Sequence, residues 1–380
     1  MNKHTEEVSN KLKLIRQSLS ENNAQGLRLR GTDWFAWVTG GASNTVLLTA
    51  ETGIAEVLVT PEDAWVLTDE IEAQRLIDEE LPANFKLQVN PWADTLAREN
   101  FVRDATSSGI IVSDRPSDTP NKLKVETELP PSLYRYKRIM MPSELERYRE
   151  VGRKASEAMT EVLKAAKPTW TEYQLAGAGA EALWSKGLHP ALTLVAGERR
   201  LPLYRHATPT TEKIGNQAMM VFCARGYGLY ANLTRFVCFG VDKQSNEMQS
   251  NKTQNFASLH SCVREIEAQA LNLCKPGIPL NAVYESLAQA YERHGFNHAI
   301  REHHQGGTTG YLAREIIANP STDDTLSENM AVAWNPSLAG AKIEDTFVIL
   351  EGGNLENLTF DANFPHVKVE GRLRSVPLEN

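Results

Sequence analysis

Two adjacent prolines, Pro130 and Pro131, divide this chain of 380 residues into two parts with different patterns. Proline has a fixed φ and no backbone N–H, so the pair cannot lie inside a helix or a central strand. Before the prolines, helical and strand-like segments alternate. After them, helical segments come first and strand-rich segments follow. We therefore expect two domains, over residues 1–132 and 140–370.

The first part contains short apolar runs between helical patterns. Runs at 45–50 and 54–61, joined by a turn at 51–53, are typical of a β-hairpin. Runs at 64–69 and 109–114 predict two further strands. Strands interleaved with helices indicate a small α/β domain.

The second part begins with a long helical pattern that starts at Ser143. Apolar runs at 192–197, 218–224 and 233–240 predict strands, and long helices are expected over 250–274 and 280–294. Helices followed by antiparallel strands indicate an α+β domain, so the fold class expected for the chain is α+β.

Composition excludes several classes of protein. The chain is 41% hydrophobic and 23% charged with a net charge of −8, which is typical of globular proteins and gives no positive surface for nucleic acid. Neither a signal peptide nor an apolar run of about 20 residues is seen, so no membrane partner is expected. The four cysteines lack C-x-x-C spacing, and reduced thiols in a cytoplasmic protein are expected.

Four segments in the second part carry a family resemblance. They are RHATPTTEKIG (205–215), MMVFCARGYGLYANLTRFVCFG (219–240), HHQGGTTGYLARE (303–315) and NPSLAGAKIEDTFVI (335–349). In this order they resemble the creatinase/aminopeptidase P/prolidase family, peptidase family M24, and residues 30–41 resemble its N-terminal domain. The resemblance implies a pita-bread C-terminal domain preceded by a smaller creatinase-like α/β domain. It also implies a homodimer in which the N-terminal domain of one subunit lies near the active site of the other.

The same resemblance implies that the metal site of this family is lost. Its peptidases hold two divalent ions with two aspartates, a histidine and two glutamates. Carried onto this sequence, the first four positions fall on Cys223 or Ala224, Asn232, Gly307 and Asn335, and only Glu344 remains acidic. Two dications need anionic or imidazole ligands, which this set does not supply. We therefore expect a divergent member of the family without a metal cofactor, although His303, His304 and Cys223 offer one alternative mononuclear site.

Three residues are the candidates for proton transfer: His206, Glu344 and His304. His206 matches the catalytic histidine of creatinase, and an imidazole titrates near neutral pH. Without metal, Glu344 must pair with a cation such as Arg314 or Arg235, or its pKa must rise and make it a usable acid or base. Adjacent side chains diverge, so only one of His303 and His304 is expected to face the pocket, and His304 is preferred.

The candidates for binding a small-molecule substrate are Arg314, Asn232, Asn335, His303, Arg235 and Tyr311. Arg314 replaces a family histidine and could hold a carboxylate with both of its terminal nitrogens, or form a salt bridge with Glu315 or Glu344 instead. The two asparagines are neutral and, if buried, need hydrogen-bond partners.

These residues suggest a metal-independent, creatinase-like hydrolase that cleaves a C–N bond of a small amino-acid-like or dipeptide-like substrate. Two alternatives remain open at this point. One is an Xaa-Pro-type metallopeptidase, as in aminopeptidase P and prolidase, with an unusual metal site. The other is a pseudoenzyme that binds but does not catalyse.

Overall fold

A computed structural model describes residues 3–117, 126–240 and 247–380 of the chain. The chain forms two compact units, Met1–Leu145 and Glu146–Asn380. None of the helices in these described ranges is long and apolar enough to cross a membrane.

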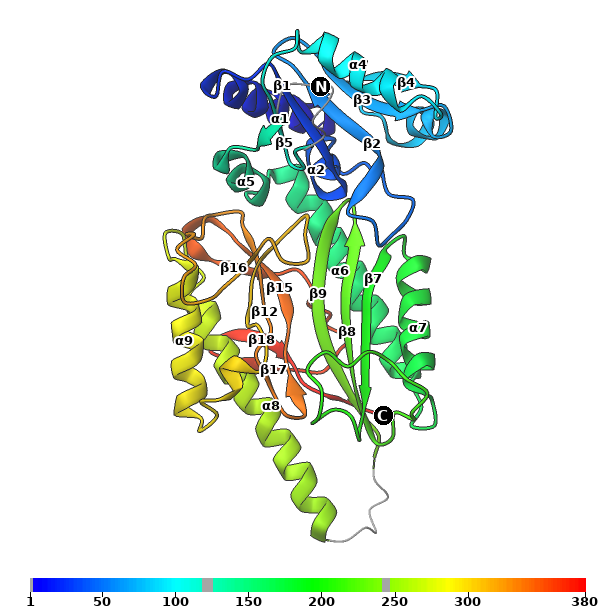
Figure 1. The fold of residues 1–380 in the computed structure, drawn as a ribbon. Coiled ribbons are helices and arrows are strands. Elements are labelled where there is room, and N and C mark those ends of the chain that lie inside the picture. The colour runs from blue at the N-terminus through cyan, green and yellow to red at the C-terminus, as the bar shows by residue number, and fades with distance from the viewer. Residues whose placement is uncertain (1–2, 118–125, 241–246) are drawn as a thin grey trace. The chain divides into compact units, whose positions relative to one another are not determined.

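The first unit is built around a six-stranded mixed sheet with the order β4-β3-β2-β1-β5-β6 (Figure 1). Its strands are β1 (Gly26–Gly31), β2 (Thr52–Val59), β3 (Ala64–Asp69), β4 (Lys86–Asn90), β5 (Ile111–Ser113) and β6 (Glu126–Glu128). Its helical segments are α1 (Lys3–Glu21), α2 (Thr32–Val38), α3 (Ala73–Arg75), η1 (Leu76–Glu80), α4 (Thr95–Ala105) and α5 (Pro131–Arg138). The alternation confirms the expected small α/β unit.

The hairpin expected at residues 45–61 is wrong. β2 pairs with β1 on one side and β3 on the other, so a strand at 45–50 would have no free edge of β2 to join. That segment forms turns instead, and Val46 and Leu47 are exposed. An apolar run indicates a strand, but composition alone does not show which sheet edges are already occupied.

The second unit contains two larger sheets, with the orders β19-β9-β8-β7 and β11-β10-β12-β15-β16, and two small ones, β13-β14 and β17-β18. The strands are β7 (His189–Gly197), β8 (Gln217–Gly226), β9 (Leu229–Cys238), β10 (Gly306–Thr309), β11 (Ile316–Ile317), β12 (Ala331–Trp334), β13 (Ser337–Leu338), β14 (Ala341–Lys342), β15 (Asp345–Ile349), β16 (Leu355–Asn357), β17 (His366–Val369), β18 (Arg372–Ser375) and β19 (Leu378–Glu379). The helical segments are α6 (Pro142–Ala165), which begins in the first unit, α7 (Glu172–Ser185), α8 (Glu247–Leu273), α9 (Leu280–Arg293), η2 (Ala299–Arg301) and η3 (Glu351–Gly353). The strands and helices predicted from 192 to 294 are confirmed.

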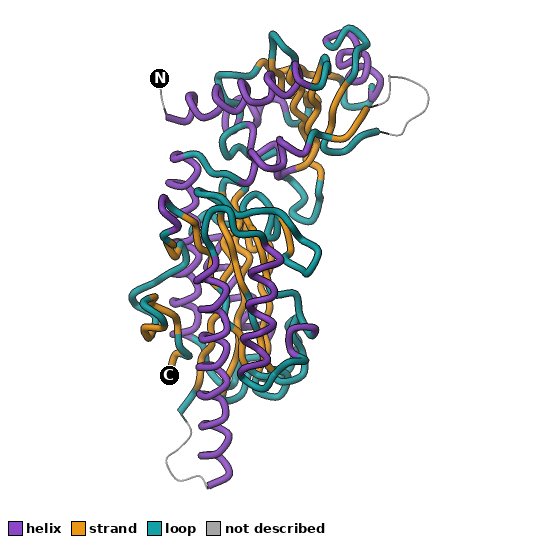
Figure 2. Tube along the Cα trace, turned by 90° about the vertical axis from the view of Figure 1, so that its left-hand side faces the viewer, coloured by secondary structure: helices purple, strands orange, loops and turns teal. Residues whose placement is uncertain are grey.

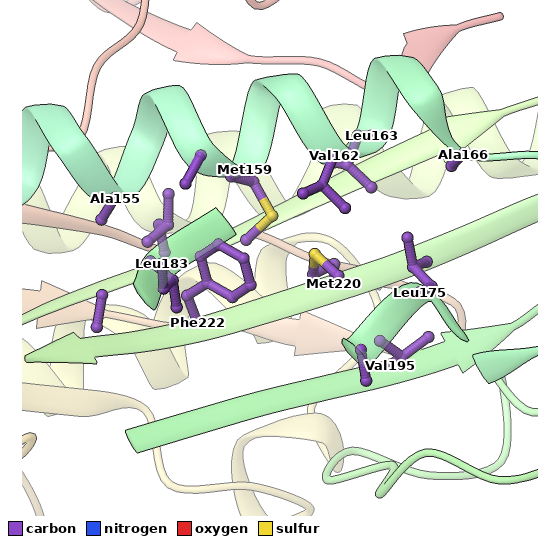
Figure 3. Packing of buried hydrophobic residues seen from close by; sticks show 14 of the residues in the cluster. Ala155, Met159, Val162, Leu163, Ala166, Leu175, Leu183, Val195, Met220 and Phe222 are labelled. Atoms are coloured by element: carbon purple, nitrogen blue, oxygen red, sulfur yellow. The ribbon is translucent and has the colours of Figure 1, made fainter. Parts of the chain in front are cut away.

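The long helices of this unit run alongside its strands (Figure 2). One face of α6 is apolar because Val151, Ala155, Met159 and Val162 recur at spacings of three or four residues. These side chains pack with α7 and with residues of β7 and β8 such as Phe222 (Figure 3). Helices α8 and α9 form a second core with β12 and β15. Each of the two larger sheets therefore has its own helical cover.

The two larger sheets meet at one isolated bridge between Thr234 of β9 and Glu344, the residue before β15. The Thr234 N–H donates to the Glu344 carbonyl at 3.0 Å. This junction fixes the position of Glu344 against β9.

A network of buried charged side chains stabilises this junction. Asp345 accepts hydrogen bonds from Arg235 of β9 and from Arg374 of β18, each at 2.7 Å. Arg374 also contacts both carboxylate oxygens of Glu267 on α8. All four side chains are almost completely buried. The network ties two other strands and a helix to Asp345, the residue beside Glu344.

Replacing Arg374 with methionine should strongly destabilise the second unit. The variant leaves Glu267 buried without its cation, and breaking a buried ion pair from one side costs about 3–5 kcal/mol. Arg153→Met is the matched control, because Arg153 forms an exposed pair with Glu157 within α6. Its expected cost is below about 1 kcal/mol. Urea unfolding followed by circular dichroism measures both, and equal losses would contradict the assigned role of the network.

Candidate functional site

Three histidines lie together in the second unit. His206 comes from the loop between β7 and β8, while His303 and His304 lie just before β10, separated from it by Gln305. A nitrogen of each ring lies within 4.8 Å of the other two. The Nε2 atoms of His206 and His303 are 2.9 Å apart, and the rings of His303 and His304 stack with centroids at 4.5 Å. The expectation that only His304 faces the pocket is therefore wrong.

The reason is a local hydrogen bond that the sequence does not show. The Nδ1 of His303 contacts the carbonyl oxygen of His304, and a carbonyl can only accept, so Nδ1 carries the proton. This contact brings the His303 ring over its neighbour. In neutral His303 the lone pair is then on Nε2, so His206 donates its Nε2–H to it.

One ion pair links the two loops, and a close contact between β10 and β12 fixes the chain that follows His304. Arg205 and Glu302, the residues before His206 and His303, form an ion pair. In β10, a Cβ on Gly306 would lie 2.1 Å from the Ala333 oxygen. Only glycine allows β10 to lie this close to β12, and this close approach sets the direction in which the chain leaves His304.

Glu344 is the charged centre of the site. Its carboxylate forms an ion pair with Arg314, lies 3.5 Å from the Lys342 ammonium and accepts a hydrogen bond of 3.0 Å from the Thr234 hydroxyl. Burial alone would raise the pKa of this carboxyl, but Lys342 and Arg314 outweigh it and lower the pKa to about 2. Of the two expectations for Glu344, pairing with a cation is observed and a raised pKa is not.

The three imidazoles are neutral at pH 7. Burial, followed by Lys342 and the neighbouring imidazoles, lowers the pKa of His303 to about 3. Burial and the charge on Arg314 lower the pKa of His304 to about 4. Partial burial and Lys342 also lower the pKa of His206, which is the most exposed of the three rings. Each neutral imidazole has one unprotonated nitrogen, but the low pKa values of His303 and His304 make these two rings weak bases, which leaves His206 as the candidate base.

Both arginines expected to bind substrate form ion pairs inside the protein. Arg235 donates to the Asp345 carboxylate and to three backbone carbonyls, one of them that of Glu344. The expectation that Arg235 binds substrate is therefore corrected to a role in the buried network. Arg314 pairs with Glu344, which is one of the alternatives left open for it, and donates to the Ala313 carbonyl. Because Nη2 is bound to Glu344, Arg314 does not have both terminal nitrogens free to hold a substrate carboxylate.

Asn232 and Asn335 are both buried near this junction. The Asn232 amide donates to the Thr309 hydroxyl at 2.9 Å, and the Asn335 N–H donates to the Gln305 carbonyl. Among the described residues, neither side-chain oxygen has a hydrogen-bond donor. Tyr311 is completely buried as well. A buried acceptor without a donor is costly, and a bound water or substrate donor would remove that cost.

The residues at the five positions implied for a pair of metal ions do not suit that role. Asn232 and Asn335 are neutral amides, and Glu344 is already neutralised by side-chain cations. Burial raises the pKa of the Cys223 thiol to about 12, so it is not a thiolate at neutral pH. At Gly307 a Cβ would lie 2.0 Å from the Ile316 oxygen, so no side chain fits there in this conformation.

Lys342 is a site residue that the sequence motifs do not single out. A signal for it was present, since it lies two residues before Glu344 in an extended segment, and residues two apart project to the same side. Its charge also affects the three histidines.

Known proteins share this fold. The family model for metallopeptidase family M24 matches residues 146–351, which include every site residue described above. The X-Pro aminopeptidase from Thermotoga maritima has 18% identity, covers 93% of this chain and 98% of its own, and has a TM-score of 0.74. The Xaa-Pro dipeptidase from Bacillus anthracis has 15% identity and a TM-score of 0.76, and the match covers 98% of this chain and 100% of the dipeptidase.

A third solved structure with this fold is a domain of a complex subunit. The N-terminal domain of FACT complex subunit SPT16 from Cicer arietinum has 12% identity and a TM-score of 0.69, and the match covers 94% of this chain and 96% of that domain. No curated protein sequence matches the chain significantly. At these identities the solved structures establish the pita-bread fold, and the family match establishes the family. The chain therefore belongs to metallopeptidase family M24 and, with it, to the hydrolases that act on C–N peptide bonds.

Proposed function

We propose that this hydrolase cleaves a C–N bond of a small amino-acid-like or dipeptide-like substrate without metal ions, in a creatinase-like manner. The observation that carries the proposal is the pairing of Glu344 with Arg314 and Lys342. In the sequence comparison, Glu344 is the only acidic metal-ligand position that remains, and side-chain cations already balance its charge.

The charge of the site supports a substrate with a carboxylate. Arg314 and Lys342 bring two positive charges against the single negative charge of Glu344, and the three imidazoles are neutral. The excess positive charge attracts an anion. An amino acid or peptide also carries amine or amide hydrogens, which are suitable donors for the unpartnered oxygens of Asn232 and Asn335.

His206 is the proposed proton carrier. Because its Nε2–H is donated to His303, the lone pair of neutral His206 is on Nδ1. Nδ1 removes a proton from water as the water oxygen bonds to the substrate carbon. When the C–N bond breaks, the proton passes from His206 to the leaving nitrogen, so the imidazole ends neutral.

In this mechanism His303 is a positioning residue and Glu344 does not exchange protons. His303 fixes the tautomer of His206 through its own contact with the His304 carbonyl. Glu344 remains ionised and holds Arg314 in place. A carboxyl with a pKa near 2 is too weak a base for efficient proton transfer at neutral pH.

Turnover should persist in chelator and depend on His206. Chelator-treated protein is offered Xaa-Pro dipeptides, other dipeptides, and N-acyl and N-amidino amino acids, and products are measured by mass spectrometry. His206→Ala should lower the rate by about 10²–10⁴-fold, the range typical of a lost acid–base group. His298→Ala, an exposed histidine outside the cluster, should retain the wild-type rate.

Three outcomes would contradict the proposal. Turnover that appears only after zinc or manganese is added would indicate an Xaa-Pro-type metallopeptidase with an unusual site. Full turnover by His206→Ala would remove the mechanism. Substrate-induced thermal stabilisation across the panel, with no product, would favour a binding pseudoenzyme.

Removing the Lys342 charge should raise the pKa of His206. Burial lowers this pKa below 6.5, and Lys342 lowers it further because a nearby cation disfavours imidazolium. Activity should therefore fall below pH 6.5 as His206 protonates, and in Lys342→Met this loss should begin at higher pH. NMR titration of the His206 ring gives the same test without substrate. An unchanged or lower pKa in Lys342→Met would contradict the predicted charge effect.

A further inference from the structure

The three-histidine cluster has the composition of a transition-metal site. Nitrogens from His206, His303 and His304 lie within 4.8 Å of one another, and none of these residues is among the five ligand positions that the sequence comparison implied. His304 Nδ1 is buried, and no hydrogen-bond partner for it is found in the described part of the chain. A buried imidazole nitrogen without a partner is destabilising, and a ligand that binds to it removes this cost.

We propose that His206, His303 and His304 bind one divalent transition-metal ion, and that a metal bound there inhibits the enzyme by occupying the imidazole that carries the proton. The binding half of this proposal stands on the geometry alone. The inhibitory half rests on the function proposed above.

The distances are suitable for one ion. Tetrahedral coordination with bonds of about 2.0–2.1 Å places ligand nitrogens roughly 3.3 Å apart. The Nε2 atoms of His206 and His303 are 2.9 Å apart, and the remaining separations do not exceed 4.8 Å. His206 lies on a loop and is exposed, so its ring can turn by the small amount required. A water molecule would complete the shell.

The hydrogen bonds around the cluster also support metal binding. His303 donates Nδ1–H to the His304 carbonyl, which leaves its Nε2 lone pair directed at His206. A ligand histidine typically donates its second nitrogen to a carbonyl or carboxylate in this way. Binding through His206 Nε2 requires only that its proton move to Nδ1, which removes the Nδ1 lone pair that acts as the base.

The ligand chemistry selects the class of metal. Three neutral imidazoles favour zinc, cobalt, nickel or copper over magnesium or calcium, which prefer oxygen ligands. Arg314 and Lys342 repel a dication, and Glu344 offsets part of that repulsion. We therefore expect reversible binding, weaker than in a structural zinc site.

The test uses the full chain and measures binding separately from activity. Chelator-treated protein is titrated with Co²⁺, and the visible d–d absorption reports coordination, followed by displacement with Zn²⁺. We expect one Co²⁺ per chain. Both His206→Asn and His304→Asn should weaken binding by at least about tenfold. The matched control His298→Asn should bind as wild type. Because His206 is exposed, its variant should fold normally, which thermal unfolding without metal verifies.

The outcomes separate the two proposals. Saturable Co²⁺ binding that depends on His206 and His304, together with inhibition by Zn²⁺, supports the inference. No saturable binding, or equal binding in all three variants, overturns the metal site and leaves the proposed function intact. Metal that binds the cluster and activates the enzyme overturns both inhibition and metal-independent hydrolysis.

Discussion

The second unit depends on the buried ion network around Asp345. Arg235 and Arg374 approach this carboxylate from β9 and β18, and Glu267 holds Arg374 from α8. Isolated charges could not remain at such burial, so each group constrains the position of the others. Because neighbouring residues in an extended strand point to opposite sides, fixing Asp345 in the network directs Glu344 the other way, towards Arg314 and Lys342.

Charge compensation then explains the character of the site. A family built around dications needs several acidic ligands, whereas this chain balances one carboxylate with two side-chain cations. Burial and positive charge keep the nearby imidazoles neutral, which leaves a lone pair on each ring for a metal ion and, on His206, for a proton. The proposed hydrolysis and the proposed inhibitory metal site thus make competing use of the same lone pairs on His206.

The fold was largely predictable where local pattern decides it. The strands near 192–240 and the helices near 250–294 follow apolar periodicity and are confirmed. The segment 45–50 has the same kind of apolar run but forms turns, because β1 and β3 already occupy both edges of β2. Strand pairing is a long-range property that a local window does not contain.

The sequence by itself determined the family and the two-part organisation, and it shows non-ligand residues at four of the five positions that the resemblance implies for metal ligands, because these depend on residue identity and order. Tertiary structure alone brought His206 beside His303, which is 97 residues away, and turned His303 onto the His304 carbonyl. It also paired Glu344 with Arg314, assigned Arg235 to Asp345 instead, and placed Lys342 beside Glu344, a neighbour that the sequence motifs do not single out. Such pairings depend on the distances between charged groups that are far apart in the sequence. These distances, and the electrostatic energies that follow from them, are set only when the strands and loops pack.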